Sequence, residues 1–210
     1  MSSQSTVYVV DDDQATRASV CALVEGLGYV AVPFPTGEAL LREFDPSWSG
    51  CLVTDYRMPG MNGLELQERL SERGSHLPVI VVSGYANVPV TVRAMRMGAV
   101  TLLEKPYQEY ELASAIREAL LRHEENRHRV LRHARIHDRI EALTFEERRV
   151  MRQIVAGKMN KVIALELGLG KRTVERYRHN IFEKMHVDSV AELARTVAEV
   201  VTSDHPATSS

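Results

Sequence analysis

Asp55 has the residue type and the position that phosphoryl transfer chemistry requires. It follows the apolar residues 51–53, which predict a buried strand, and it precedes a turn that contains Pro59, Gly60 and Gly63. A carboxylate at the carboxyl end of a parallel strand lies where open α/β sheets place their ligands. We therefore predict that Asp55 is a nucleophile that accepts a phosphoryl group.

Four other polar residues follow apolar segments in the same way: Asp11, Asp12, Ser83 and Lys105. Neighbouring carboxylates repel one another unless a cation lies between them, and Mg²⁺ bridges carboxylates to phosphate oxygens. Lys105 supplies a compact positive charge, and the hydroxyl of Ser83 can donate a hydrogen bond to a phosphoryl oxygen. These residues predict one Mg²⁺ site beside Asp55. The bond between Lys105 and Pro106 is a candidate cis peptide.

The surrounding sequence predicts the elements that bring these residues together. Five apolar, β-branched segments alternate with five helical patterns, which predicts a parallel sheet covered on both faces. The carboxyl ends of parallel strands share one edge, so the polar residues converge there. The predicted strands are 6–10, 29–32, 51–55, 77–83 and 100–103, and the helices are 15–27, 36–44, 64–72, 90–97 and a long one from 109.

Residues 5–121 resemble a response-regulator receiver domain with a flavodoxin-like fold. The motifs are residues 9–13 (VVDDD), 54–59 (TDYRMP) with Met61 and Gly63, 83–84 (SG) and 104–106 (EKP). The resemblance implies that Asp55 is the phosphoacceptor. It also implies that Mg²⁺ binds Asp11, Asp12, Asp55 and the backbone carbonyl of Arg57, and that Ser83 and Lys105 stabilise the phosphoryl group.

The same resemblance assigns switching and dimerisation roles. Arg57 and Tyr85 occupy positions that tune hydrolysis of the acyl phosphate. Leu102 stands where the family has an aromatic switch residue, so an aromatic flip is not expected here. The helix that contains Val90 and Ala94 is expected to form a homodimer contact on phosphorylation.

Residues 122–142 form the predicted connector. No glycine or proline occurs between residues 107 and 157, and the apolar stripe is thin, which predicts a long helix or two helices with a break near residues 123–128. Four histidines (His123, His128, His133 and His137) lie here, and only the last two share a helical face. We interpret them as histidines on a solvated helix rather than as metal ligands.

The last third of the sequence predicts a helix-turn-helix. Thr144 and Glu147 form a capping box before the first helix, and two further helices at 160–167 and 171–185 are joined by the turn 168–170. A fourth helix is predicted from about residue 189 to 201. Basic, hydroxyl and aromatic side chains on the third helix are suited to the DNA major groove.

Residues 143–202 resemble the LuxR/FixJ-type DNA-binding domain, through the patterns LT with ER at 143–148, VAG at 155–157, NK at 160–161 and RTVE at 172–175. Gly170 replaces the usual serine cap, Arg176 a common apolar residue and Tyr177 a common histidine. Dimer contacts are expected from Val190, Leu193 and Val197. The predicted DNA-binding residues are Asn160, Lys161, Lys171, Arg172, Thr173, Arg176, Tyr177 and Arg178.

The composition is that of an ordinary globular protein, with 210 residues, 44% hydrophobic and 26% charged. Residues 1–121 hold 9 basic and 15 acidic residues, a balance of −6, and the remaining 17 basic and 13 acidic residues give +4. This asymmetry favours an acidic site in one half and a nucleic-acid surface in the other. With no apolar run of membrane length, no signal peptide and only Cys21 and Cys51, we expect a cytoplasmic protein with a disordered tail at 203–210.

The fold prediction is therefore α/β plus all-α: a flavodoxin-like five-stranded receiver domain (1–121), a helical linker (122–142) and a four-helix helix-turn-helix domain (143–202). The expected function is transcriptional control in a two-component phosphorelay, in which a sensor histidine kinase phosphorylates Asp55 and a homodimer binds a double-stranded DNA operator. The chain is expected to catalyse only its own phosphorylation and dephosphorylation. The alternatives are a phosphorylation-independent adaptor, a DNA-binding protein without receiver control, and a haloacid-type phosphatase, which Arg57 disfavours because that fold needs a second aspartate there.

Overall fold

The computed structural model describes residues 5–84 and 88–201. The chain divides into two compact units, Met1–Asn126 and Arg127–Ser210, and each is described by itself. The tail predicted to be disordered lies outside the described residues, as does Tyr85. No described helix is long and apolar enough to cross a membrane.

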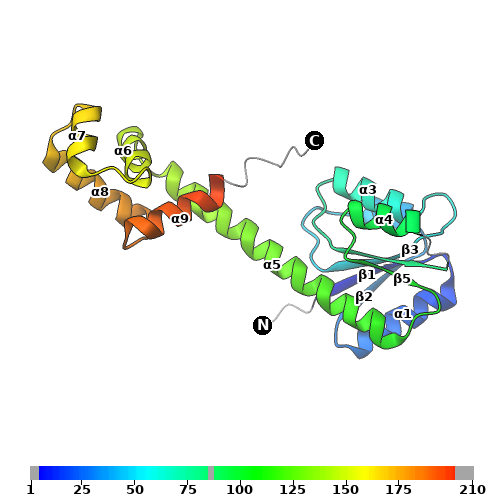
Figure 1. The fold of residues 1–210 in the computed structure, drawn as a ribbon. Helices are drawn as coiled ribbons and strands as arrows, with labels where there is room; N and C mark the ends of the chain where they lie inside the picture. Colours follow the sequence, from blue (N-terminus) through cyan, green and yellow to red (C-terminus); the bar gives the residue numbers. More distant parts are fainter. Residues whose placement is uncertain (1–4, 85–87, 202–210) are drawn as a thin grey trace. The chain divides into compact units, whose positions relative to one another are not determined.

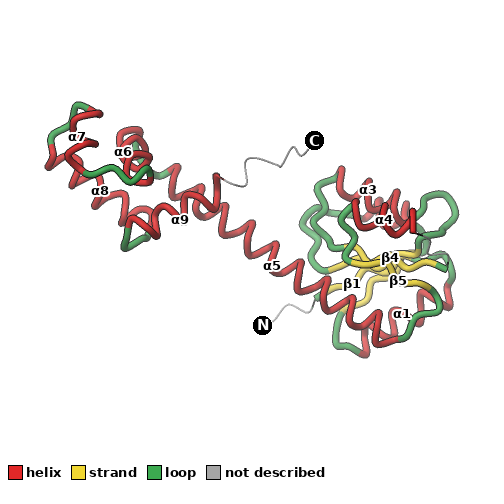
Figure 2. The backbone as a smooth tube through the Cα atoms, viewed as in Figure 1, coloured by secondary structure: helices red, strands yellow, loops and turns green. Residues whose placement is uncertain are grey.

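The first unit contains a five-stranded parallel sheet in the order β2-β1-β3-β4-β5 (Figure 2). The strands are β1 (Thr6–Val10), β2 (Val30–Phe34), β3 (Cys51–Asp55), β4 (Val79–Ser83) and β5 (Thr101–Glu104). Every residue of β3 and β4 is buried, because both faces of these central strands are covered. The predicted doubly wound parallel sheet is confirmed.

Helices cover both faces of this sheet, with α3 and α4 on one side and α1 and α5 on the other (Figure 1). One apolar core includes Leu40, Leu66 and Val81, and the second includes Val24, Ile80 and Leu112. The helices are α1 (Gln14–Gly26), α2 (Gly37–Glu43), α3 (Gly63–Glu72), α4 (Val88–Arg96) and α5 (Glu109–Glu141). Each predicted helix is present, with its ends displaced by at most two residues where the sequence gave both ends.

A cluster of aromatic rings lies beside the loop that leads into β3. The ring of Trp48 stacks on Tyr8 at 4.3 Å between centroids and on Phe34 at 6.1 Å, and it meets the edge of Phe44 at 5.7 Å. Offset and edge-to-face aromatic pairs of this kind add stabilisation beyond the area that they bury. The cluster fixes the loop through Trp48 at the amino-terminal end of β3.

The predicted connector is part of α5, which continues without a break for 33 residues to Glu141. The long-helix alternative is therefore confirmed. The interpretation of His123 as a solvated residue is wrong: this side chain is only 8% exposed. Its Nε2 lies 3.1 Å from the hydroxyl of Ser49, and its Nδ1 lies 3.4 Å from the carbonyl oxygen of His76. His123 thereby attaches α5 to the loops before β3 and β4.

The second unit contains a helical core formed by the end of α5 and four helices: α6 (Phe145–Val155), α7 (Asn160–Leu167), α8 (Lys171–Met185) and α9 (Val190–Val201). Thr144 and Glu147 form the predicted capping box at the start of α6. Gly168 ends α7 with φ of 66°, a left-handed conformation that suits glycine at this position. The predicted order of four helices is confirmed.

Candidate functional site

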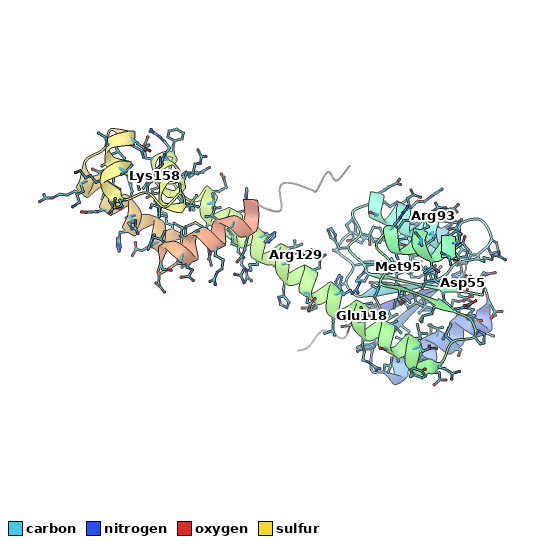
Figure 3. The ribbon with its side chains drawn as sticks, in the orientation of Figure 1. Asp55, Arg93, Met95, Glu118, Arg129 and Lys158 are labelled. Atoms are coloured by element: carbon cyan, nitrogen blue, oxygen red, sulfur yellow. The ribbon has the colours of Figure 1, made fainter. Side chains whose placement is uncertain are left out.

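Asp55 lies at the carboxyl end of β3, at one edge of the sheet (Figure 3). It is 8% exposed, and Asp11, at the end of the neighbouring β1, is 6% exposed. The Nζ of Lys105 lies 2.5 Å from Oδ1 of Asp55 and 3.1 Å from Oδ2 of Asp11. The structure therefore brings together three residues that are far apart in the sequence, as the parallel topology requires.

Backbone groups of the next loop orient Asp55. The amide of Arg57 donates to Oδ2 of Asp55 at 2.6 Å, and the amide of Gly63 donates to the carbonyl of Tyr56 at 3.0 Å. A Cβ atom at Gly63 would lie 2.5 Å from the carbonyl oxygen of Asp55, so only glycine allows this close approach. Asn62 and Glu65 form a capping box that fixes the start of α3 directly after the loop.

Arg17 belongs to this site, although the sequence analysis did not select it. Its Nη1 donates to the carbonyl oxygen of Asp11 at 2.6 Å and lies 3.5 Å from that of Asp12. The amide of Asp13 donates to Oδ1 of Asp11 at 2.9 Å. These bonds fix the backbone that carries both acids. The only signal in the sequence was an arginine one turn into the helix that follows the acidic triplet.

The charges at this site act on one another. Burial raises the pKa of the Asp11 carboxyl group, and the charge of Asp55 raises it further, although Lys105 opposes both effects. Burial lowers the pKa of Lys105, but its hydrogen bond and charge interaction with Asp55, and those with Asp11, outweigh this, so that pKa is raised. Lys105 is therefore a firmly protonated cation that two buried carboxylates share.

The other residues predicted at this edge occupy different environments. Ser83 is fully buried at the end of β4, and its carbonyl accepts the amide of Lys105 at 2.8 Å. The peptide bond between Lys105 and Pro106 is cis, as predicted. Leu102 is half-buried against the core on the α3–α4 side of the sheet, directly opposite Val81 in the strand register.

The second unit carries the predicted DNA-binding residues on α7 and α8. Lys161, Lys171, Arg172 and Arg176 are exposed, whereas Asn160, Thr173, Tyr177 and Arg178 are half-buried. Nη1 of Arg178 donates to Oδ1 of Asn160 at 3.2 Å, which joins the two helices at this surface. Gly170 precedes α8 without a side-chain cap, the weakness expected from the missing serine.

A buried ion pair supports α8 from below. The carboxylate of Glu147 is 2% exposed; it accepts from Lys184 at 2.7 Å and from Asn180 at 3.2 Å, and it also accepts the amide of Thr144. These bonds outweigh the cost of burial and lower the pKa of Glu147 to about 2. Sequence analysis identified Glu147 as a capping residue but not its partners on α8.

Comparison with known proteins agrees with both sites. Residues 7–117 match the response regulator receiver domain, and residues 141–197 match the luxR family of bacterial regulatory proteins. The transcriptional regulatory protein FixJ of Azorhizobium caulinodans is 41% identical over 189 residues, which cover 90% of each chain. The chain belongs to the FixJ-type response regulators.

Solved structures of response regulators resemble this one. The response regulator StyR matches with a TM-score of 0.83 at 37% identity, over 94% of this chain and all of the other. Full-length FixJ from B. japonicum matches with a TM-score of 0.59 at 35% identity, over 96% and 99% of the chains. This FixJ-type regulator therefore joins a receiver domain to a LuxR-type DNA-binding domain, and it is a DNA-binding transcriptional regulator of a two-component system.

Receiver domains generally bind Mg²⁺ at the phosphorylation site. In the described part of this chain, no three His, Cys, Asp or Glu side chains are placed to hold a metal ion. The ammonium group of Lys105 instead lies between Asp11 and Asp55 and marks a position where two carboxylates share a cation. Carboxylate oxygens are the donors that Mg²⁺ prefers, so the chemistry of the residues fits this ion.

The dimer residues expected from the sequence are only partly accessible. Ala94 and Leu193 are fully buried in the cores of their own units, so the prediction that they offer contact surface is wrong for this structure. Val90, Val190 and Val197 are half-buried against those cores. The helical period places other apolar side chains of α4 outward, namely Val88, Val92 and Met95, and Figure 3 shows Met95 on this helix.

Proposed function

We propose that Asp55 is the phosphoacceptor of this regulator. The observation that carries the proposal is Lys105, whose ammonium contacts Asp55 and Asp11 at the shared edge of the sheet. A carboxylate oxygen of Asp55 attacks phosphorus, the bond from phosphorus to the histidine nitrogen of the sensor kinase breaks, and the electron pair returns to the imidazole. An acyl phosphate on Asp55 is the product, and water later cleaves it.

The chain's own residues support this transfer in distinct ways. The amide of Arg57 orients the Asp55 carboxylate, and Lys105 neutralises charge that develops on a phosphoryl oxygen. Ser83, at the end of the adjacent strand, is the proposed donor to a second phosphoryl oxygen. Asp11, Asp12, Asp55 and the Arg57 carbonyl are the proposed ligands of one Mg²⁺, which supplies further neutralisation of phosphate charge when bound. Tyr85 and Arg57 remain the proposed tuners of hydrolysis.

The output is proposed to be a homodimer whose two α8 helices enter the major groove of an operator. Half-sites about one helical turn apart, roughly 34–36 Å, suit two such helices. Arg172 and Arg176 are exposed on α8 and can reach base edges, while Lys161 at the start of α7 can reach phosphates. DNA as the partner places the protein in the cytoplasm. Val92 and Met95 extend the proposed dimer surface on α4.

The decisive experiment is phosphorylation by acetyl phosphate with Mg²⁺, in wild type and Asp55→Ala, read by intact mass, DNA binding at two salt concentrations and light scattering. We expect one phosphoryl adduct on wild type only, together with dimerisation and tighter, salt-sensitive DNA binding. Asp45→Ala is the matched control, because Asp45 is an exposed aspartate elsewhere in the same unit. An adduct that persists in Asp55→Ala, or its absence from wild type, contradicts the proposal.

A further inference from the structure

A pocket of about 300 Å³ lies in the receiver domain, at the end of the sheet opposite the acid site. Its walls come from α3, from the residues that lead into β4, from the end of α4 and from α5. β4 begins at this pocket with Val79 and ends at Ser83, so the strand separates the two sites. Figure 3 shows Glu118 of α5, one turn before the pocket residue Arg122, well away from Asp55.

A buried amide group in the wall of this pocket lacks one of its hydrogen bonds. Gln67 is 6% exposed, and its Nε2 donates to the carbonyl oxygen of Met97 at 2.8 Å, which fixes the orientation of the amide. Its Oε1 accepts no hydrogen bond from any described residue. Buried polar groups are nearly always paired, so an unpaired acceptor beside a pocket of this size indicates a missing donor.

The lining residues define the chemistry of that donor. Leu70, Leu77 and Val79 supply apolar walls, and no aspartate or glutamate lines the pocket, so a buried cation would have no counter-charge. Arg122 lies at the α5 side and is already paired with Glu118 at 2.6 Å, so the wall does not call for an anion. The volume is at the lower end of the range for small-molecule pockets, about 300–1,000 Å³.

We propose that this pocket binds a small neutral aromatic molecule that donates an N–H or O–H group to Oε1 of Gln67. Arg122 and Asn126 bring α5 into the pocket, and His123 between them is bonded to the carbonyl of His76, another lining residue. A ligand therefore contacts the stretch of α5 that directly precedes the second unit, which begins at Arg127. Occupancy strengthens the attachment of this stretch to the receiver domain.

Indole and 1-methylindole are a matched pair of probes, because the methyl group removes the only N–H donor. We would titrate the full chain with each and follow the amide signals of residues 67–79, 97–100 and 122–126 by NMR. Indole is expected to bind saturably in the millimolar range and at least about tenfold more tightly than 1-methylindole, the discrimination that a buried polar partner gives. Amide exchange of residues 122–126 is expected to slow at the same time.

Two variants make the proposal falsifiable. Ser71→Phe changes an exposed wall residue, should fill the pocket and is expected to abolish the indole shifts; Gln67→Leu is expected to remove the preference for indole. Gln108→Leu, an exposed glutamine at the start of α5, is the control and should behave as wild type. No saturable shift with indole, equal affinity for both probes, or shifts that survive Ser71→Phe would each overturn the proposal. Asp55→Ala should bind indole normally, because this site does not depend on phosphorylation.

Discussion

The Nζ of Lys105 lies 2.5 Å from Oδ1 of Asp55, a residue fifty positions earlier in the chain. The two side chains meet because β3 and β5 flank β4 in one parallel sheet and end at the same edge. An ammonium group held there in the resting protein is already in place for charge that appears on a phosphoryl group. Preorganised charge of this kind is the main source of catalysis in phosphoryl transfer.

Replacing Lys105 by alanine is expected to slow phosphorylation by acetyl phosphate about 10²- to 10³-fold, the range for loss of one preorganised donor. The rate of adduct formation, measured by intact mass at fixed Mg²⁺, tests this. Lys158→Ala is the matched control, because Lys158 lies in the second unit and pairs with Glu166. An unchanged rate in Lys105→Ala would show that this contact serves only stability.

Arg17→Met is expected to weaken Mg²⁺ binding about tenfold, because outer residues that orient metal ligands have effects of that order. The methionine removes the donor to the carbonyl oxygen of Asp11 but keeps most of the side-chain volume. Calorimetric titration with Mg²⁺ measures the effect directly. Arg42→Met, a change at an exposed arginine of α2, should leave the affinity unchanged. Equal affinities for both variants would contradict the positioning role of Arg17.

Asp11→Asn is expected to stabilise the receiver domain at pH 7 in the absence of Mg²⁺. The folded pKa of Asp11 is raised by burial and by Asp55, so its charged form opposes folding above the ordinary carboxyl pKa, and the penalty is relieved as pH falls through that range. Urea unfolding should show a higher midpoint at pH 7 and a gain that shrinks in acid. Asp12→Asn, at an exposed neighbour, should show a smaller gain. A lower midpoint for Asp11→Asn would mean that the Lys105 contact outweighs burial.

Glu147→Gln is expected to destabilise the DNA-binding domain by about 3 kcal/mol at pH 7, from a carboxyl pKa lowered to about 2 from its ordinary 4.5. A lowered pKa gives stability above pH 4.5 that is lost as pH falls towards 2, so wild type and variant should converge in acid. Amide exchange of residues 143–200 measures this, with the receiver amides as an internal reference. Glu146→Gln, next in sequence and half-exposed, is the control. A pH-independent difference would argue against the ion pair with Lys184.

Arg172→Ala and Arg176→Ala are each expected to weaken operator binding by about 1–3 kcal/mol if they contact bases, and to relax the preference at one position of each half-site. Lys161→Ala should weaken binding to all sequences alike and reduce the salt slope by about one, because it contacts phosphate. Binding curves at several salt concentrations separate the two kinds of effect. Arg152→Ala, an exposed arginine of α6, is the control. Loss of binding without a change in preference would reassign the α8 arginines to phosphate contacts.

The sequence was sufficient for the sheet and for the acid site because strong local signals coincided. Asp11, Asp55 and Lys105 each follow an apolar run, and parallel topology alone brings such residues to one edge. The capping boxes at Asn62 and Thr144 likewise act over three residues and can be recognised locally. Predictions of this kind depend on spacing rather than on distant packing.

Features that depend on distant partners could not be predicted. Glu147 pairs with Lys184, 37 residues away, and His123 reaches Ser49 and His76 from a helix whose composition looks solvent-exposed. Ala94 was placed on a dimer surface by family resemblance, but the turn of α4 directs it into the core. Helical periodicity around Val88 and Val92 would have favoured the outward residues, had the exact start of α4 been known.

Trp48 is the single tryptophan of the sequence, and it stacks on Tyr8 one residue before Ser49, the partner of His123 on α5. The regulator therefore contains one intrinsic fluorophore, placed where the long helix is attached to the receiver domain. Any change that alters this attachment, from phosphorylation at the far edge of the sheet or from a ligand near Gln67, should shift its emission. The unmodified protein can thus report its own switching in an ordinary fluorimeter.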